Sequence, residues 1–186
     1  MDKTDGRVVT VLIAALMLAL GGLALAQVKK GEKAPDFTLS TLDGKGVKLK
    51  PLVTKGKDRK AAIVVAFWGT WCGPCRAEAP RLQELYEKYE KQGLAVIGIA
   101  EMDSPRQVRQ FVDACKLSYT IAVDSEKSPV ALKYGVIDKR GYVQVPQLFL
   151  IDSDGVLREH HTGYALGSEK ILEKEIKAIL AEKPKT

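Results

Sequence analysis

Residues 61–75 read AAIVVAFWGTWCGPC, and they predict a buried strand followed at once by a pair of cysteines. Residues 61–67 are apolar, uncharged and partly β-branched, which is typical of a strand buried on both faces. From Arg76 onward, apolar residues recur every three or four positions, as on an amphipathic helix. Cys72 and Cys75 therefore lie at a strand-to-helix junction, where free amide groups and the helix dipole favour a thiolate over a thiol.

The two cysteines have the spacing of a dithiol/disulfide switch. Cys72, at the exposed mouth of the helix, is expected to attack, and Cys75, one turn inside, to resolve the mixed disulfide. The alternatives are half of a zinc site and a structural disulfide. Zinc needs two more soft ligands, for which the chain offers only Cys115 and the pair His160 and His161. A structural disulfide around so small a loop would constrain the unfolded chain little. We therefore predict no metal and no cofactor besides the redox-active disulfide.

Three motifs resemble one known family. Residues 71–75, WCGPC, match the active-site motif of the thioredoxin superfamily. Residues 31–39, GEKAPDFTL, resemble the opening of its TlpA/ResA-like, AhpC/TSA-redoxin related branch, whose members carry an extra N-terminal β-hairpin. Residues 145–155, VPQLFLIDSDG, resemble the family's cis-proline loop, strand and hairpin. The resemblance covers nearly all of the chain beyond its N-terminal segment.

The resemblance implies an α/β, thioredoxin-like fold: a central mixed β-sheet flanked by helices, with an extra N-terminal β-hairpin. The sequence pattern agrees, because strands alternate with helices before a final hairpin and helix. Strands are expected at residues 37–39, 47–49, 61–67, 94–100, 119–123, 145–151 and 156–160, and helices from residue 76 and at 104–116, 128–134 and 168–182. Ser104 is the expected cap of its helix, with Pro105 at the first helical position.

A proline at position 146 lies in a strand-like run, where proline is poorly tolerated. The resemblance implies that its peptide bond is cis, and that Pro146 faces Cys72 and leaves the backbone of Val145 free to pair with a bound peptide. A trans proline in an edge strand is the alternative. The expected substrate-binding residues are Trp71, Gly73, Pro74, Val145 and Pro146.

One departure from cytosolic thioredoxins concerns the proton acceptor for Cys75. Their buried aspartate is replaced here by Ala66. Glu78, on nearly the same side of the helix as Cys75, matches a glutamate of ResA-like proteins and is the candidate catalytic replacement. Burial would raise its pKa, whereas a solvated helix glutamate is the alternative. Glu101, at the end of the second buried strand, is a weaker candidate.

A second departure is the segment 137–144, where family members have one or two residues. It lies beside the expected substrate groove, so it either alters the choice of partner or is a neutral surface loop. Cys115, on the apolar side of its helix, is expected to be a buried structural thiol. We assign no chemistry to His160 and His161.

The N-terminal segment indicates where the protein works. Residues 8–26 contain no charge and are long enough to cross a bilayer core, and Ala24-Leu25-Ala26 has the form of a signal cleavage site. We predict a signal peptide or membrane anchor at residues 1–26 and one thioredoxin-like domain at residues 27–186. Lysines after the segment favour cleavage. The expected location is extracytoplasmic, either secreted or N-terminally anchored.

The chain is basic, with 29 Lys and Arg against 23 Asp and Glu and a formal net charge of +6. Much of the excess lies between Lys29 and Lys60. No nucleic-acid partner is expected, because neither interleaved aromatic residues nor a recognisable binding module is visible. A solvated basic face or mild attraction to anionic lipid headgroups is the expected meaning.

The expected function is an exported thiol:disulfide oxidoreductase that acts on cysteine pairs of client proteins. The resemblance implies reduction, for example in cytochrome c maturation, with electrons from a membrane thiol-disulfide donor, although direction depends on the reduction potential. One alternative is a thiol peroxidase of the peroxiredoxin class, but Thr70 is at the wrong distance from Cys72 for that motif. The other is a non-enzymatic thioredoxin-fold binding module.

Overall fold

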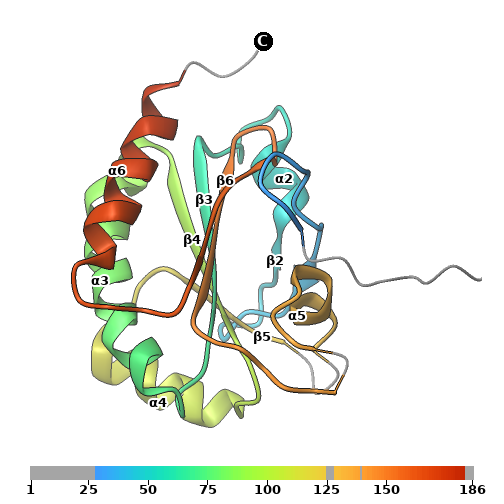
Figure 1. The fold of residues 1–186 in the computed structure, drawn as a ribbon, viewed down its shortest axis with the longest axis vertical. Coiled ribbons are helices and arrows are strands. Elements are labelled where there is room, and N and C mark those ends of the chain that lie inside the picture. Colours follow the sequence, from blue (N-terminus) through green and yellow to red (C-terminus); the bar gives the residue numbers. More distant parts are fainter. Residues whose placement is uncertain (1–27, 125–127, 139, 183–186) are drawn as a thin grey trace, which may run out of the picture.

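The computed structural model describes residues 28–124, 128–138 and 140–182, and within them one mixed five-stranded sheet forms the centre (Figure 1). Its strands lie in the order β5-β4-β3-β6-β7. β3 pairs in parallel with β4, as does β4 with β5, whereas β6 runs antiparallel to both β3 and β7. The expected α/β fold with a mixed sheet is confirmed. The strands are β3 (Ala62–Trp68), β4 (Leu94–Ala100), β5 (Thr120–Val123), β6 (Gln147–Asp152) and β7 (Leu157–Thr162).

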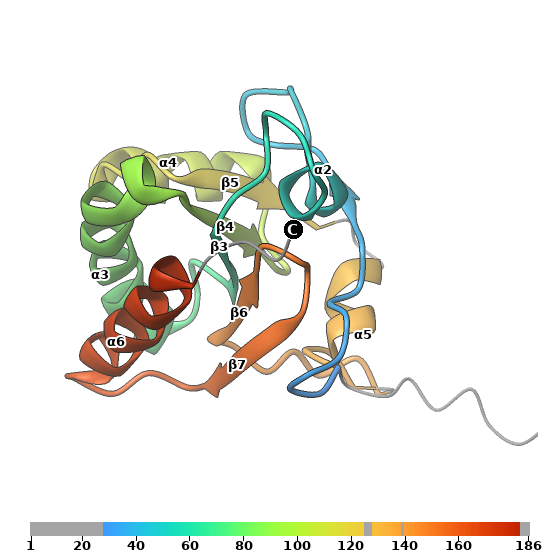
Figure 2. The ribbon, with the colours of Figure 1, turned by 90° about the horizontal axis from the view of Figure 1, so that it is seen from above.

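Helices cover both faces of this sheet. Figure 2 shows α3, α4 and α6 on one side of it and α2 and α5 on the other. These elements are α2 (Leu49–Val53), α3 (Gly73–Tyr89), α4 (Pro105–Cys115), α5 (Pro129–Tyr134) and α6 (Ser168–Ala181), and a 3-10 turn, η1 (Glu90–Gln92), follows α3. The strand that leads to the cysteines is therefore sandwiched between two helical layers.

Strand β3 is buried along its whole length, as its apolar run predicts. Because successive side chains of a strand point to opposite faces, Val64 and Trp68 belong to the core beneath α3 and α6. Val65 and Phe67 belong to the second core, beneath α2 and α5. Pairing with β4 on one side and β6 on the other sets the register of β3, and so sets where the chain leaves the sheet to begin α3.

The expected N-terminal hairpin is present as a separate two-stranded sheet. Its strands, β1 (Thr38–Leu39) and β2 (Val47–Lys48), run antiparallel. The short helix α2 begins directly after β2, and its residue Leu49 is buried in the second core. The prediction of a strand at Leu49 is wrong, because five helical residues are too few to display a helical period.

The expected start of α4 is confirmed. Ser104 accepts a hydrogen bond from the backbone of Gln107 and forms a capping box with it, and Pro105 follows in the first turn. The predicted signal peptide or anchor at residues 1–26 lies outside the described residues. None of the helices in the described part of the chain has the length and apolar character needed to span a bilayer.

Candidate active site

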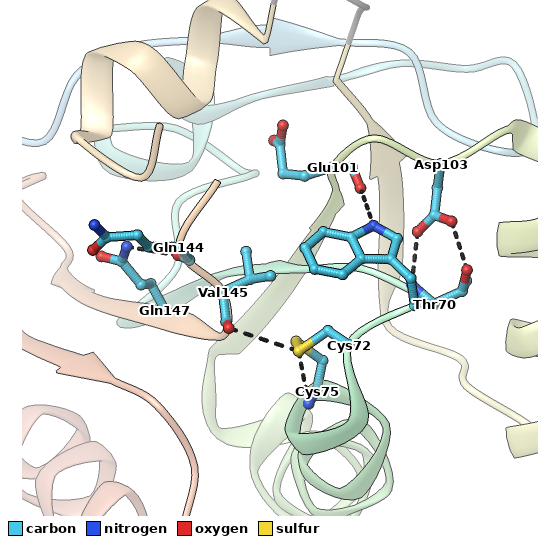
Figure 3. Close-up of a disulfide and its surroundings, with 9 residues drawn as sticks. Thr70, Cys72, Cys75, Glu101, Asp103, Gln144, Val145 and Gln147 are labelled. Atoms are coloured by element: carbon cyan, nitrogen blue, oxygen red, sulfur yellow. Dashed lines mark hydrogen bonds between the residues drawn. A yellow bond between two sulfur atoms is a disulfide. The ribbon is translucent and has the colours of Figure 1, made fainter. Parts of the chain in front are cut away.

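The two cysteines form a disulfide at the N-terminus of α3, at the end of the sheet where β3 stops (Figure 3). Their Cα atoms are 5.3 Å apart. Cys72 is the N-cap residue, and its Sγ accepts a hydrogen bond from the backbone N–H of Cys75 at 3.2 Å. Pro74 occupies the first turn, where it costs no helical hydrogen bond. The amide and the positive end of the helix dipole thus act on Cys72, the sulfur that Sequence analysis expects to attack.

Cys72 is more enclosed than its predicted position at the exposed end of the helix implied. It is 6% exposed, against 1% for Cys75. Cys72 is more exposed than Cys75, as the predicted roles require, but it is buried rather than exposed at the N-terminus of α3. The loop before β6 contributes to this enclosure, because the carbonyl oxygen of Val145 lies against the sulfur of Cys72.

The loop before β6 brings Val145 to the active site. The Val145–Pro146 peptide bond is cis, as the resemblance implied, and Gln147 begins β6 immediately afterwards. The carbonyl oxygen of Val145 lies 3.7 Å from the Sγ of Cys72. Figure 3 shows this carbonyl pointing at the disulfide. A client segment bound beside Cys72 would therefore lie next to the main chain of residue 145.

The loop between β3 and α3 is held from the far side by the residues that follow β4. Asp103 accepts hydrogen bonds from the backbone N–H of Thr70 at 2.7 Å and from its hydroxyl at 2.5 Å. The indole of Trp71 donates to the carbonyl of Glu101 at 3.1 Å, while the side chain remains 52% exposed. A Cβ at Gly69 would come within 2.6 Å of the Trp71 Nε1, so only glycine leaves room for the indole.

Glu78 is buried, so the alternative that it is a solvated helix glutamate is wrong. It is 4% exposed, and burial raises its pKa to about 8. It lines a partly open cavity of about 120 Å³ between α3, β6, β7 and α6, together with Leu148 and His161. A carboxyl group with this pKa is protonated over much of the neutral range, so it can both accept and return a proton there. Its coupling to the cysteines stays a prediction.

Glu101 is buried as well, but its carboxyl group does not point toward the disulfide. Its side chain is fully enclosed, and burial raises its pKa to about 8, with the nearby charge of Asp124 acting in the same direction. Figure 3 shows the carboxyl group of Glu101 pointing away from Cys72 and Cys75. Its contribution to the site is its backbone carbonyl, which anchors Trp71.

A polar network that the sequence did not predict supports the loop carrying Val145. The side-chain amide of Gln147 donates to the carbonyl of Gln144 at 2.7 Å, and its oxygen lies 2.8 Å from Nε2 of His160. The ring of His160 stacks on Phe149, with centroids 4.3 Å apart. The imidazole was given no role from sequence, because its partner lies on a neighbouring strand. Gln147 and His160 together tie the end of the 137–144 segment to the sheet.

Segment 137–144 forms a short antiparallel bridge between Ile137 and Val143, and its last residue enters the network just described. Cys115 is a free thiol, and it is half-buried rather than buried. His161 pairs with Glu175 of α6 at 2.7 Å. Within the described ranges, no cluster of three His, Cys, Asp or Glu side chains could hold a metal ion.

A thioredoxin fold with a cysteine pair at the start of the helix after its central strand defines a class of protein, the thiol:disulfide oxidoreductases. A comparison with family models shows which family within this class the chain belongs to. The chain belongs to the AhpC/TSA family, whose model matches residues 30–160.

Several similar proteins are named for this activity. The thiol-disulfide oxidoreductase ResA of Bacillus anthracis is 35% identical over 133 residues, 72% of this chain and 69% of that protein. ResA of Geobacillus thermodenitrificans is 32% identical over 161 residues, 83% of this chain and 85% of its own. A crystal structure of a thiol:disulfide interchange protein from Chlorobium tepidum superposes with a TM-score of 0.67 at 26% identity, over 84% of this chain and all of that one. The chain is a thiol:disulfide oxidoreductase.

Proposed function

We propose that this protein works outside the cytoplasm and reduces disulfides of client proteins through Cys72 and Cys75. The observation that carries the proposal is the position of Cys72, which caps α3 and faces the carbonyl of Val145. The helix end stabilises a thiolate, and the main chain of residue 145 offers an extended client segment a place to bind beside it.

The exchange has two steps, and two electrons pass to the client. The Cys72 thiolate attacks one sulfur of the client disulfide, forms a mixed disulfide and releases the other client sulfur as a thiolate, which takes up a proton. Cys75, deprotonated, then attacks the Sγ of Cys72. The intramolecular disulfide forms, and the client leaves with both of its cysteines reduced. A thiol donor must afterwards return this disulfide to the dithiol.

Glu78 is the proposed proton acceptor for Cys75. It lies one turn along α3 from Cys75, and its pKa of about 8 is close to the ordinary pKa of a thiol, about 8.5. Proton transfer between groups of similar pKa is efficient in both directions. Trp71, Gly73, Pro74, Val145 and Pro146 are the proposed contacts with the client, because they flank the two sulfurs.

The location of the protein, its client proteins and its electron donor are proposed from the N-terminal segment and the family resemblance. The uncharged residues 8–26 support export, either as a cleaved signal or as an anchor. The family resemblance supports a reductant, with apocytochrome thiols in cytochrome c maturation as the proposed example and a membrane thiol-disulfide protein as the donor. Segment 137–144, which ends beside the client-facing loop, is a proposed determinant of client choice.

The deciding experiment is the reduction potential of the Cys72–Cys75 couple, measured by equilibration with a dithiol of known potential. A reductant should have a potential on the order of −270 mV, as thioredoxin has, whereas a value of about −120 mV would make the protein an oxidant. Two assays address the alternatives. Peroxide consumption at a peroxidase rate would favour the peroxiredoxin reading, and client binding that survives replacement of both cysteines would favour the binding module.

A further inference from the structure

The net charge of the chain is concentrated in one segment. Residues 28–60, which form the N-terminal hairpin and α2, contain ten Lys and Arg and four Asp and Glu. Residues 61–186 contain seventeen of each sign, and residues 1–27 contain two of each. The excess of six positive charges therefore belongs entirely to the segment before β3.

Within this segment, five lysines form what we call the basic end: Lys48, Lys50, Lys55, Lys57 and Lys60. The first four are exposed and Lys60 is half-buried. Among the described residues, none of these five takes part in an ion pair, whereas three other basic residues of residues 28–60 do. Their charge is thus not neutralised locally, and it is free to act on a partner.

Three of the five lysines of the basic end line a hollow. Lys48, Lys57 and Lys60, with Lys45, line an open groove of about 560 Å³ between the hairpin and the loop after α2. Asp58 is the single acidic residue in its lining. Long ammonium side chains around a shallow groove suit small anionic groups presented from a surface, because each ammonium can reach a different one.

The basic end and the disulfide lie at opposite ends of the sheet. Strand β3 begins at Ala62, two residues after Lys60, and ends at Trp68, four residues before Cys72. Its seven residues span roughly 20 Å at about 3.3 Å per residue. Figure 1 shows α2 toward one end of the sheet and the start of α3 at the other. A planar partner bound at the basic end would leave the active site open on the far side.

We propose that the basic end is a docking surface for a membrane rich in anionic lipids, and that it holds the domain with its disulfide facing away from the bilayer. Lipid phosphates supply the complementary charge, and each lysine close to an anionic surface strengthens binding about fivefold. A second feature of the chain favours lipid over an acidic protein. The apolar residues 8–26 are long enough to cross a bilayer core and end two positions before Val28, where the described domain begins. If this segment is retained as an anchor, it keeps the basic end close to lipid.

The test uses the full chain added to preformed vesicles, either neutral phosphatidylcholine or the same lipid with one-third phosphatidylglycerol. A membrane-impermeant amine-acetylating reagent then modifies exposed lysines, and mass spectrometry gives the rate at each. Lys48, Lys55 and Lys57 should react at least about fivefold more slowly on the anionic vesicles, and high salt should remove the difference because it screens exposed charges. Lys116, the exposed C-cap residue of α4, should react equally on both, because Figure 1 shows α4 toward the end of the sheet where α3 begins.

Two triple variants with the same change of net charge provide the control. K48Q/K55Q/K57Q should abolish the lipid-dependent protection of Lys50 and Lys60, whereas K170Q/K174Q/K177Q, on α6, should retain it. Equal acetylation rates on both kinds of vesicle, or protection lost equally in both variants, would overturn the proposal. Protection on native membranes that is missing on anionic vesicles would also overturn it, in favour of an acidic protein partner.

Discussion

Asp103 holds Thr70 with both of its carboxylate oxygens, although 33 residues separate them in the chain. Thr70 lies two residues before Cys72, and Asp103 lies in the loop between β4 and α4. Together with the bond from Trp71 to the carbonyl of Glu101, this pair fixes the loop that enters α3. The position of the attacking sulfur therefore depends on a residue that touches neither cysteine.

Replacing Asp103 with alanine should lower the free energy of unfolding by about 1.5 kcal/mol, toward the lower end for hydrogen bonds to a charged group because Asp103 is half-buried. It should also slow reduction of a client disulfide and shift the pH profile of that rate, because a looser loop changes the environment of Cys72. Urea unfolding and stopped-flow kinetics measure the two effects. Thr70→Ser, which keeps the hydroxyl, should retain the wild-type pH profile, whereas an unchanged profile in Asp103→Ala would show that the pair is only structural.

Replacing Cys75 with serine should trap mixed disulfides between Cys72 and client proteins, because attack remains possible and resolution is lost. Non-reducing electrophoresis followed by mass spectrometry of the trapped species measures this. Cys72→Ser is the matched control and should trap few partners. Accumulation of covalent partners in the Cys72→Ser variant alone would reverse the two roles.

Replacing Glu78 with glutamine should shift the titration of the reduced cysteines and slow exchange near neutral pH, because it removes a proton acceptor while keeping the size of the side chain. The pH dependence of thiol alkylation in the reduced protein measures the shift. Glu101→Gln is a control of the same chemistry, since the carboxyl group of Glu101 turns away from the disulfide. If both variants titrate like the wild type, Glu78 has no part in proton transfer.

Stability should depend on pH through the same residue. Folding raises the pKa of Glu78 from 4.5 to about 8, so the folded state binds this proton more tightly than the unfolded state. Its contribution is fully present below about pH 4.5 and is lost as the pH rises toward 8, with a slope of at most about 1.4 kcal/mol per pH unit. Urea unfolding of the oxidised protein at pH 5 and pH 8 should show a smaller loss of stability in Glu78→Gln than in the wild type. Equal losses would contradict the assignment.

Replacing Gln147 with leucine should weaken turnover of protein clients more than that of a small disulfide. The change removes the bonds to the carbonyl of Gln144 and to His160, so the loop that carries Val145 loses its support, whereas a small disulfide needs only access to the sulfur. Steady-state kinetics should show a raised KM for the protein client. His161→Gln, next to His160 on β7 but paired with Glu175 of α6, should leave that KM unchanged. Equal effects on both substrates would place Gln147 outside client binding.

Much of the fold was predictable from local sequence because the signals that define it are local. The apolar run of β3 is followed by the two cysteines and then by a helical period, and these residues are neighbours in both sequence and space. Ser104 caps α4 through a residue three positions away. Such elements depend on propensity, burial and short-range hydrogen bonds, which a single segment contains in full.

The sequence by itself thus determined the junction of β3 with α3 and the pair of thiols at its tip, while the tertiary structure decided how that tip is enclosed. Whether Glu78 is solvated or buried depends on the packing of α3 against β6, β7 and α6. The contact of Val145 with Cys72, and the support that Asp103 gives to Thr70, join segments that only the pairing of β3 with β6 and β4 brings together. No local pattern contains these contacts, because a long-range contact is set by the register of the whole sheet rather than by either of the residues that make it.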